Sequence, residues 1–316
     1  MSFEQFLSRL ETLLPVRRGE PMADHTTFRI GGPAEAYVHP HDCLELHGVV
    51  VLAQEWEVPL FLLGAGSNLL VGDNGIPGLV VETWYNRDLP AEKLEAKGIH
   101  GAASVQVNAF CGIPLPRIAY QTARAGLAGL EWAVGIPGTI GGGVVNNAGA
   151  HGSCMADVVQ SVLVWSPQGE RILMSHELGF GYRDSNFRTR NQDASPHQVI
   201  VSVELLLRPE APEALESRIA EHVAHRRATQ PSQRSVGSIF KNPEGYAAGW
   251  LIEQAGLKGR RIGDAQISTK HANFIVNRGH ANAAVVNELM LIAQTKIRED
   301  FGIQLEPEIQ KVGEGF

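Results

Sequence analysis

The sequence predicts a mixed α+β protein. Its 316 residues suggest two domains or three small ones, because one domain usually takes roughly 150 residues. Residues 3–14 and 42–56 each open on a capping box, and the first range carries apolar residues at helical spacing. Residues 59–64 form a short apolar run and residues 104–110 alternate, as strands do. Helices and strands therefore occur together from the start of the chain.

The same patterns continue to the end of the chain. Helices are expected at 114–126, 213–228, 245–255 and along a last amphipathic segment that ends at Gly302. Strands are expected at 78–82, 159–165, 171–174, 199–208 and 272–277. A proline at position 209, followed by polar residues, predicts a domain boundary near 209–212.

Composition and charge narrow the classes of function. The chain is 44% hydrophobic with a net charge of −7, and no cluster of basic residues is longer than Arg226–Arg227 or Arg260–Arg261. Nucleic-acid binders gather Lys and Arg, so no nucleic-acid partner is expected. Cys43, Cys111 and Cys154 form no CxxC pair, which excludes a disulfide framework and favours the cytoplasm. No leader or spanning segment is recognisable, so no membrane partner is expected.

A first glycine-rich loop follows the predicted strand at 59–64. Gly64-Ala65-Gly66-Ser67-Asn68 begins like a dinucleotide fingerprint, with Glu82 18 residues after Gly64. Leucine takes the place of the third glycine, and residues 71–78 break helices, so a Rossmann unit is excluded. The loop can still offer N–H groups and a hydroxyl to a phosphate. A tight turn between two strands is the alternative.

A second glycine-rich stretch spans residues 135–152. Seven of its 18 residues are glycine, an entropic cost that is justified where the backbone must approach something closely. A pyrophosphate is the natural ligand, because successive N–H groups form anion-binding nests. No lysine lies between Lys97 and Lys241, so the stretch is not a Walker A loop. A structural crossing without a ligand is the alternative.

Three further segments carry candidate chemistry. Arg183 can stabilise a developing anion with its fork of donors, or it can lie in a surface loop stacked on an aromatic ring. Ser238 can donate a proton or contact a ligand, or belong to an ordinary Ser/Gly turn. Glu308, between Pro307 and Ile309, is a candidate for a partly buried carboxylate or for a solvated strand residue. The twelve histidines are scattered without an HExxH motif, so no metal is expected.

Eight motifs occur in one order along the chain. They are TFRIGG (27–32), GAGSNLL (64–70), GIPGTIGG (135–142), NAGAHG (147–152), GYRDSNF (181–187), GSIFKNP (237–243), KHANFIVN (270–277) and EPEI (306–309). Together they closely resemble the UDP-N-acetylenolpyruvoylglucosamine reductase (MurB) family of bacterial peptidoglycan synthesis. The resemblance runs from about residue 20 to 313, and eight motifs in register are far more specific than any one of them.

The resemblance implies a three-domain α+β flavoprotein. Residues 1–82 and 83–210 would form the two parts of an FAD-binding unit of the vanillyl-alcohol-oxidase (PCMH) type, and residues 211–316 a substrate-binding domain. It implies FAD as cofactor, NADPH as hydride donor and UDP-N-acetylglucosamine enolpyruvate as small-molecule substrate. NADPH would reduce the flavin, and the enolpyruvyl double bond would then accept hydride from flavin N5, with negative charge building as an enolate.

The matching family positions assign three groups of residues. For catalysis, Ser238 would deliver the proton, and Arg183 with Glu308 would stabilise the enolate. The residues expected to bind FAD are Phe28, Gly64, Ala65, Gly66, Ser67, Asn68, Ile136, Pro137, Gly138, Thr139, Gly142, Asn147, Ala148 and Gly149. The residues expected near the substrate are Tyr182, Lys241, Asn242, Lys270 and Asn273.

The chain departs from some members of the family. Those members carry an inserted segment with a substrate-clamping tyrosine, whereas here residues 208–232 are one predicted helix without tyrosine. The chain therefore resembles the shorter subgroup. Arg226, Arg227 and Arg234 are candidates, on charge alone, for the group that covers the substrate diphosphate.

Two other functions remain open from the residues. A nucleotide-binding sensor would keep the glycine loops, but it does not need Ser238, Arg183 and Glu308 together. An oxidase on the same FAD fold often carries a covalent flavin on His or Cys, and His151 and Cys154 lie near the second glycine loop. The GSIFKNP and EPEI motifs argue against the oxidase.

Overall fold

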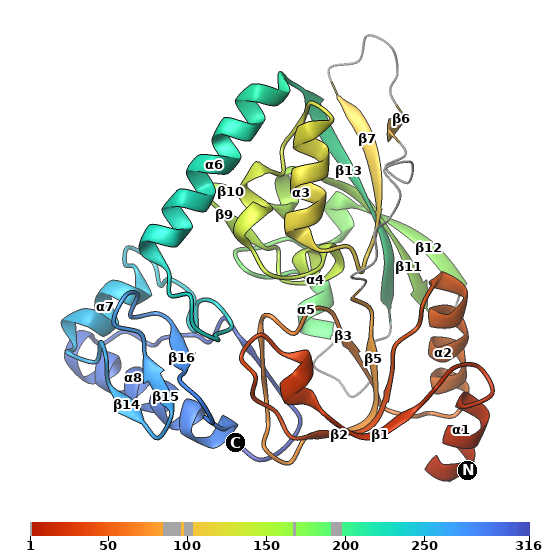
Figure 1. Cartoon of the computed structure of the whole chain (residues 1–316), viewed down its shortest axis with the longest axis horizontal. Coiled ribbons are helices and arrows are strands. Elements are labelled where there is room, and N and C mark those ends of the chain that lie inside the picture. Colours follow the sequence, from red (N-terminus) through yellow and green to blue (C-terminus); the bar gives the residue numbers. More distant parts are fainter. Residues whose placement is uncertain (1, 85–95, 98–103, 167–168, 191–197) are drawn as a thin grey trace. The chain divides into compact units, whose positions relative to one another are not determined.

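The computed structural model describes residues 2–84, 96–97, 104–166, 169–190 and 198–316 (Figure 1). The chain divides into two units, each built from three segments. Unit 1 comprises residues 1–16, 38–65 and 79–226, and unit 2 comprises residues 17–37, 66–78 and 227–316. Each unit therefore joins parts of the chain that are far apart in the sequence.

An antiparallel sheet forms the centre of unit 1. Its main path runs β12-β11-β13-β7-β6, and β8 pairs with the end of β13. Along β13, Val203, Leu205 and Leu207 are fully buried and alternate with less buried neighbours, as expected for a strand with one face on a core. The strands are β6 (Ala96–Lys97), β7 (Val105–Phe110), β8 (Leu127–Ala128), β11 (Val159–Ser166), β12 (Gly169–Met174) and β13 (Val199–Pro209).

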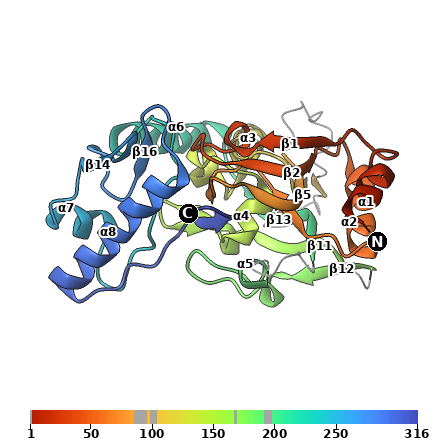
Figure 2. The same cartoon turned by 90° about the horizontal axis from the view of Figure 1, so that it is seen from below.

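The helices of unit 1 begin where the sequence offers caps. The Ser2 hydroxyl accepts from the Gln5 N–H, and the Gln5 side chain accepts from the Ser2 N–H, so the capping box of α1 (Phe3–Leu10) is complete. The Asp42 carboxylate caps α2 (Cys43–Glu55) at 2.9 Å from the Glu45 N–H. Figure 2 shows α1 and α2 side by side, and the Phe6 and Trp56 rings lie 6.2 Å apart.

The remaining elements of unit 1 surround the glycine-rich stretch. The strand β3 (Leu60–Leu63) pairs in parallel with β5 (Ile76–Glu82), whose first residues belong to unit 2. The helices are α3 (Leu115–Arg124), α4 (Ile140–Val145), α5 (Asn186–Arg190) and α6 (Pro212–Thr229), with a 3-10 helix at Glu131–Gly135. A short hairpin joins β9 (Gly149–Ala150) to β10 (Ser153–Cys154).

Unit 2 places two helices on small sheets. The strands β14 (Arg261–Ile262), β15 (Ala265–Ile267) and β16 (Ile275–Asn277) form an antiparallel sheet. The helices are α7 (Ala248–Gln254) and α8 (Ala283–Phe301). Residues of α8 share a core with Phe28, Leu70 and Phe240, which come from all three segments of the unit. Two further pairs are β1 (Arg17–Pro21) with β2 (Pro33–Val38), and β4 (Leu69–Val71) in parallel with β17 (Gln310–Val312).

The structure places a helix or strand within every range that the sequence predicts, with three differences. The first helix ends at Leu10 rather than at 14, and its last turn tightens into i,i+3 bonds such as Leu13 N–H to Leu10 O. The second capping box is half formed, because the Glu45 carboxylate accepts from the N–H of His41 rather than that of Asp42. The expected strand at 272–277 starts only at Ile275.

No helix in the described part of the chain is long and apolar enough to cross a membrane.

Two glycines of unit 2 allow the cost of backbone strain to be measured apart from the cost of a steric clash. Gly75 and Gly19 both have positive φ, but a Cβ on Gly75 would enter the carbonyl group of Pro33, whereas a Cβ on Gly19 would meet nothing within 4 Å. We expect Gly75→Ala to lower the free energy of unfolding by about 3 kcal/mol or more, and Gly19→Ala by about 1 kcal/mol. Denaturant unfolding of both variants measures the difference, and equal losses would contradict the steric argument.

Candidate active site

The two glycine-rich loops meet within unit 1. Gly64 follows β3, and a Cβ added to it would lie 2.8 Å from the Thr139 hydroxyl oxygen. Thr139 is the N-cap of α4, and its hydroxyl accepts from the Gly142 N–H at 3.2 Å. The absence of a side chain at residue 64 therefore lets the first loop approach the start of α4.

Both loops keep main-chain donors open. Among the described residues of unit 1, the N–H groups of Gly64, Ala65, Gly138 and Thr139 donate to no protein acceptor. Buried or half-buried N–H groups are normally paired, so unpaired donors in two touching loops require water or a ligand. Successive donors of this kind bind anions, and the loops therefore fit a pyrophosphate such as that of FAD.

The second half of the glycine-rich stretch is held by the protein itself. Asn147 is buried with φ +41°, and its side chain donates to Gly181 O at 2.7 Å and accepts from the Ala156 N–H at 3.0 Å. The Ala148 N–H donates to Gly143 O, and its carbonyl accepts from the Met155 N–H. The Asn147 side chain and the Ala148 main chain thus shape the loop. Ile136 and Pro137 link the 3-10 helix to Gly138 and lie outside any helix or strand.

The loop that carries Arg183 is tied to the end of α4. The Ser185 hydroxyl donates to Val145 O at 2.7 Å, and the buried Arg188 guanidinium bridges Asn146 Oδ1 and Arg183 O. The backbone of Arg183 takes φ +55°, and Arg183 Nη1 would lie 3.1 Å from a Cβ on Gly149. The glycine at 149 therefore makes room for this guanidinium, which also lies 5.6 Å from the centre of the exposed Tyr182 ring.

Asn273 organises the candidate residues of unit 2. Its side chain accepts from the Phe240 N–H at 3.0 Å and donates to Phe240 O at 2.8 Å, and its own carbonyl accepts from the Ile239 N–H at 2.8 Å. It is 3% exposed, so these bonds are shielded from water. The side chain predicted to contact substrate thus holds the backbone beside Ser238.

The same backbone segment brings Ser238 and Glu308 together. The Glu308 N–H donates to Ile239 O at 2.8 Å, and the Asn68 side chain donates to Glu308 O at 3.3 Å. Ser238 is half-buried, and within the described residues its hydroxyl has no hydrogen-bond partner. Two of the three predicted catalytic residues, Ser238 and Glu308, therefore lie on neighbouring backbone segments of unit 2.

The other predicted residues of unit 2 are engaged in contacts within the protein. Lys241 Nζ lies 3.7 Å from Glu306, and Asn242 Oδ1 accepts from the Ala248 N–H at the start of α7. The Lys270 ammonium donates to Arg227 O. Phe28, predicted to bind FAD, is fully buried in the core of unit 2, and its carbonyl accepts from the Asn277 side chain at 3.0 Å.

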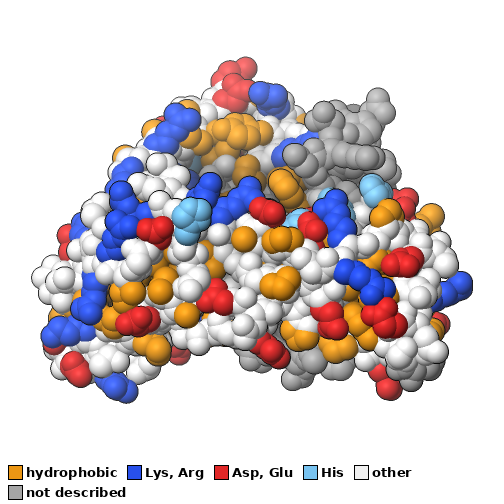
Figure 3. All heavy atoms as spheres, turned by 60° about the horizontal axis from the view of Figure 1, so that its bottom comes forward, with side chains coloured by type: hydrophobic (Ala, Val, Ile, Leu, Met, Phe, Trp, Pro, Cys, Tyr) orange, Lys and Arg blue, Asp and Glu red, His pale blue; other side chains and the backbone are white. Residues whose placement is uncertain are grey.

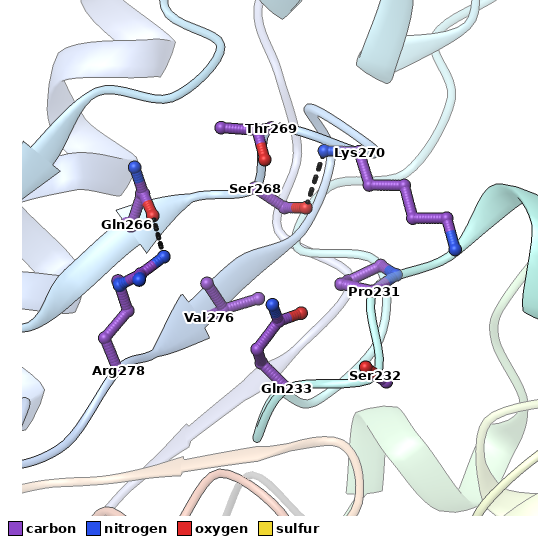
Figure 4. Close-up of a pocket in the computed structure, with 9 residues that line it drawn as sticks. All are labelled: Pro231, Ser232, Gln233, Gln266, Ser268, Thr269, Lys270, Val276 and Arg278. Atoms are coloured by element: carbon purple, nitrogen blue, oxygen red, sulfur yellow. Dashed lines mark hydrogen bonds between the residues drawn. The ribbon is translucent and has the colours of Figure 1, made fainter.

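A polar pocket of about 230 Å³ lies beside Lys270 in unit 2 (Figure 4). Figure 4 shows the Ser268 hydroxyl bonded to the main chain of Lys270, and the Arg278 guanidinium bonded to Gln266. The lining residues are Pro231, Ser232, Gln233, Gln266, Ser268, Thr269, Lys270, Val276 and Arg278. Among the described residues, no group of three or more His, Cys, Asp or Glu side chains could hold a metal ion.

The sequence did not reveal the residues whose hydrogen bonds hold the loops of the candidate site. Arg188, Ser185 and Asn277 hold loops through partly or fully buried hydrogen bonds, and the spacing of these residues in the sequence does not indicate it. Their signal is composition alone: a polar residue inside an otherwise apolar or glycine-rich segment.

Comparison with known proteins covers almost the whole chain. A reductase named UDP-N-acetylenolpyruvoylglucosamine reductase from Acaryochloris marina is 42% identical over 92% of this chain and 91% of its own length. The chain belongs to the UDP-N-acetylenolpyruvoylglucosamine reductase (MurB) family. A MurB relative from Synechococcus sp. (strain JA-3-3Ab) is 45% identical over 94% of this chain and 91% of its own length.

The fold and the family models agree with this assignment. The crystal structure of MurB from Thermus caldophilus superposes with a TM-score of 0.76 and 36% identity, covering 94% of this chain and 99% of that one. Residues 34–175 match the model of an FAD binding domain, and residues 230–312 match the MurB C-terminal domain. The predicted α+β flavoprotein fold, the FAD-dependent oxidoreductase class and the family's cofactors, FAD and NADPH, are confirmed. The three domain boundaries and the roles of single residues stay predictions.

The contact between the two glycine loops predicts a cofactor defect. Gly64→Ala would push the first loop away from Thr139 and displace its open N–H groups. We expect FAD to bind at least roughly tenfold more weakly, because one or two charge-assisted hydrogen bonds would be lost. Flavin fluorescence during FAD titration of the apoprotein measures the dissociation constant. Gly48→Ala in α2, where a Cβ comes no closer than 3.6 Å to Leu13, is the matched control.

The Asn273 bonds predict a loss of stability. Asn273→Ala would leave the Phe240 N–H and C=O unsatisfied in the core of unit 2, at a cost of about 2–4 kcal/mol. Thermal or denaturant unfolding measures this loss. Asn108→Ala, at an exposed position of β7, should change stability by less than about 0.5 kcal/mol. A similar effect of both substitutions would show that the Phe240 bonds contribute little.

Proposed function

We propose that this chain catalyses the NADPH-dependent reduction of UDP-N-acetylglucosamine enolpyruvate to UDP-N-acetylmuramate, a step of peptidoglycan synthesis. The observation that carries the proposal is the likeness, along nearly the whole chain, to enzymes that bear the name of this activity. The two glycine loops with open N–H donors support it, because the reaction needs a bound FAD. When bound, FAD takes hydride from NADPH and passes hydride to the substrate.

Arg183 is the proposed stabiliser of negative charge. Hydride addition to the terminal carbon of the enolpyruvyl group leaves an enolate spread onto the neighbouring carboxylate. A guanidinium held in place before the reaction stabilises such charge without reorganising. The bonds of Ser185 and Arg188 to the end of α4 and the space at Gly149 support this role, since the bonds hold the backbone at Arg183 and the glycine leaves room for its guanidinium.

Ser238 is the proposed proton donor. Its hydroxyl has no partner among the described residues and can therefore turn toward a ligand. Serine is a weak acid, so the transfer depends on the strong basicity of the enolate carbon and on a fixed geometry. Asn273 supplies that geometry by holding the backbone at Ile239 and Phe240. Glu308, whose main-chain N–H donates to Ile239 O, is proposed to stabilise the enolate together with Arg183.

Some of the remaining predicted residues are proposed to contact FAD or the substrate, and the others to shape the loops that do so. Gly64, Ala65, Gly66, Gly138 and Thr139 are proposed to hold the FAD pyrophosphate through their N–H groups. Ser67 and Asn68 complete the first loop, and Ile136, Pro137, Gly142, Asn147, Ala148 and Gly149 shape the second. Tyr182 and Lys241 are proposed to contact the substrate, whereas Asn242, Lys270 and Asn273 position the loops that do so.

The proposal also includes the domain organisation of the chain and its cellular location. We assign residues 1–82 and 83–210 to FAD and residues 211–316 to the substrate. Cys43, Cys111 and Cys154 form no disulfide with one another, which supports a reducing cytoplasm. Basic, acidic and hydrophobic side chains are interspersed on the face in Figure 3, and the net charge is −7, which supports a small-molecule substrate rather than nucleic acid.

The absorption spectrum of the purified protein tests the proposed function directly. A flavin band should bleach on anaerobic addition of NADPH and return on addition of UDP-N-acetylglucosamine enolpyruvate. A flavin that returns only with oxygen would replace the proposal by an oxidase. A protein that takes up no flavin on reconstitution would replace it by a binding module.

Ser238→Ala separates the two half-reactions. Reduction by NADPH should proceed at the normal rate, while reoxidation by the enolpyruvyl substrate should slow by roughly 10²–10⁴-fold, the usual contribution of general acid catalysis. Stopped-flow absorbance of the flavin measures both steps. Ser217→Ala, at an exposed position of α6, is the matched control. Equal slowing of both steps in Ser238→Ala would exclude the proton-donor role.

A further inference from the structure

The first glycine-rich loop continues from unit 1 into unit 2, which begins again at Gly66. The Gly66 carbonyl accepts from the Thr27 N–H at 3.2 Å. A Cβ on Gly66 would enter the carbonyl group of His25, and its φ is +57°, so both space and backbone conformation favour glycine here. The second half of the loop is therefore held close to the backbone of unit 2.

The strand after this loop pairs with the strand after Glu308. β4 begins at Leu69 and β17 at Gln310, and the two strands run parallel with these residues opposite each other. Just before the pair, the Gln310 N–H donates to Asn68 O at 2.9 Å. The ladder fixes which residues of the two segments face one another, and it starts at Gln310, after Glu308.

The Asn68 side chain extends the contact to Glu308 itself. Its Nδ2 donates to Glu308 O at 3.3 Å, across 240 positions of the sequence. The Glu308 N–H donates in turn to Ile239 O, in the residue after Ser238, at 2.8 Å. The main chain of Glu308 is thus bonded both to the end of the glycine loop and to the segment of Ser238. Asn68 and Glu308 are half-buried, where a hydrogen bond is stronger than in open water.

We propose that Asn68 is a positioning residue that places Glu308 for the reaction with the enolpyruvyl substrate. The inference rests on the proposed function, which gives Glu308 its role at the enolate. A carboxamide neither titrates nor carries charge in the working range of the enzyme, so it acts through the residue that it holds. A misplacement of about 1 Å can slow a reaction by roughly 100-fold, so one bond to the main chain of Glu308 is enough to matter.

A double-mutant cycle tests whether Asn68 acts through Glu308. The variants are Asn68→Ala, Glu308→Gln and the pair, each saturated with FAD so that cofactor affinity does not enter the rates. Stopped-flow absorbance of the flavin measures reduction by NADPH and reoxidation by UDP-N-acetylglucosamine enolpyruvate. We expect Asn68→Ala to leave reduction unchanged and to slow reoxidation by roughly 10–100-fold. In the Glu308→Gln background it should slow reoxidation by less than about twofold, because the carboxylate that it positions is gone.

Asn287→Ala is the matched control. The Asn287 side chain, on α8, accepts from Lys311 Nζ of β17, so this substitution also removes a carboxamide bond to the strand that follows Glu308. Both rates should stay within about twofold of the wild type. Thermal unfolding shows whether each variant keeps its fold. Slowing of reoxidation by Asn287→Ala to the same extent, full additivity in the cycle, or equal slowing of reduction and reoxidation by Asn68→Ala would overturn the proposal.

Hydrogen exchange reports the same link without turnover. Adding FAD to the wild-type apoprotein should slow exchange of the Glu308 and Gln310 amides, since both lie on the segment bonded to Asn68 at the end of the proposed FAD loop. In Asn68→Ala the effect should be lost at Glu308 and kept at Gln310, which bonds to the main chain of residue 68. Unchanged exchange at Glu308 in the wild type would overturn the proposal.

Failure of the proposed function would look different. A wild-type flavin that the enolpyruvyl substrate does not reoxidise counts against the proposed function, whereas exchange at Glu308 still decides whether Asn68 holds this residue.

Discussion

The double hydrogen bond between the Asn273 side chain and the main chain of Phe240 is the constraint on which the candidate site of unit 2 depends. A carboxamide carries an acceptor oxygen and donor N–H groups side by side, so it can satisfy an N–H and a C=O of the same residue at once, as a neighbouring strand would. Ser238 precedes this clamp and Glu308 bonds beside it. A residue predicted as a ligand contact thus acts as an internal strand substitute, and the hydroxyl of Ser238 stays available because the backbone around it is already satisfied.

Unit 1 uses the opposite strategy. Its glycine loops leave main-chain donors unsatisfied where they meet at Gly64 and Thr139, and satisfy them elsewhere, as at Ala148. The unpaired groups destabilise the empty loops, and that cost is recovered when an anion binds. The neighbouring loop of Arg183 is instead over-determined by buried polar bonds, which a residue at φ +55° requires.

The sequence predicted the long elements and the family well, and the short elements poorly. Helix α8 is predicted by the periodicity of its apolar residues and its end at Gly302, and the structure has both, with an Asn282 cap that the sequence analysis did not assign. The strands β14, β15 and β17 span two or three residues each, too few for any period; β14 and β15 pair with each other, and β17 exists because the distant β4 pairs with it. The strand at 272–277 lost its first half because Asn273 bonds to Phe240 rather than to a ladder partner. Motif order predicts the site residues, but the bonds that individual side chains make within the protein need coordinates: Asn242 and Asn273, predicted to lie near the substrate, cap or clamp the backbone.

The three-segment construction of unit 2 has a consequence for synthesis of the protein on the ribosome. Residues 17–37 and 66–78 leave the ribosome early, but the core that they share with α8 and the strand that pairs with β4 are made last. The antiparallel sheet of unit 1 lies between them in the sequence and can form first. Apolar residues such as Phe28 and Leu70 must therefore wait, exposed, until nearly the whole chain is made. The Asn74 N–H bonds to Glu314 O, so this contact within unit 2 forms only after residue 314 has been made.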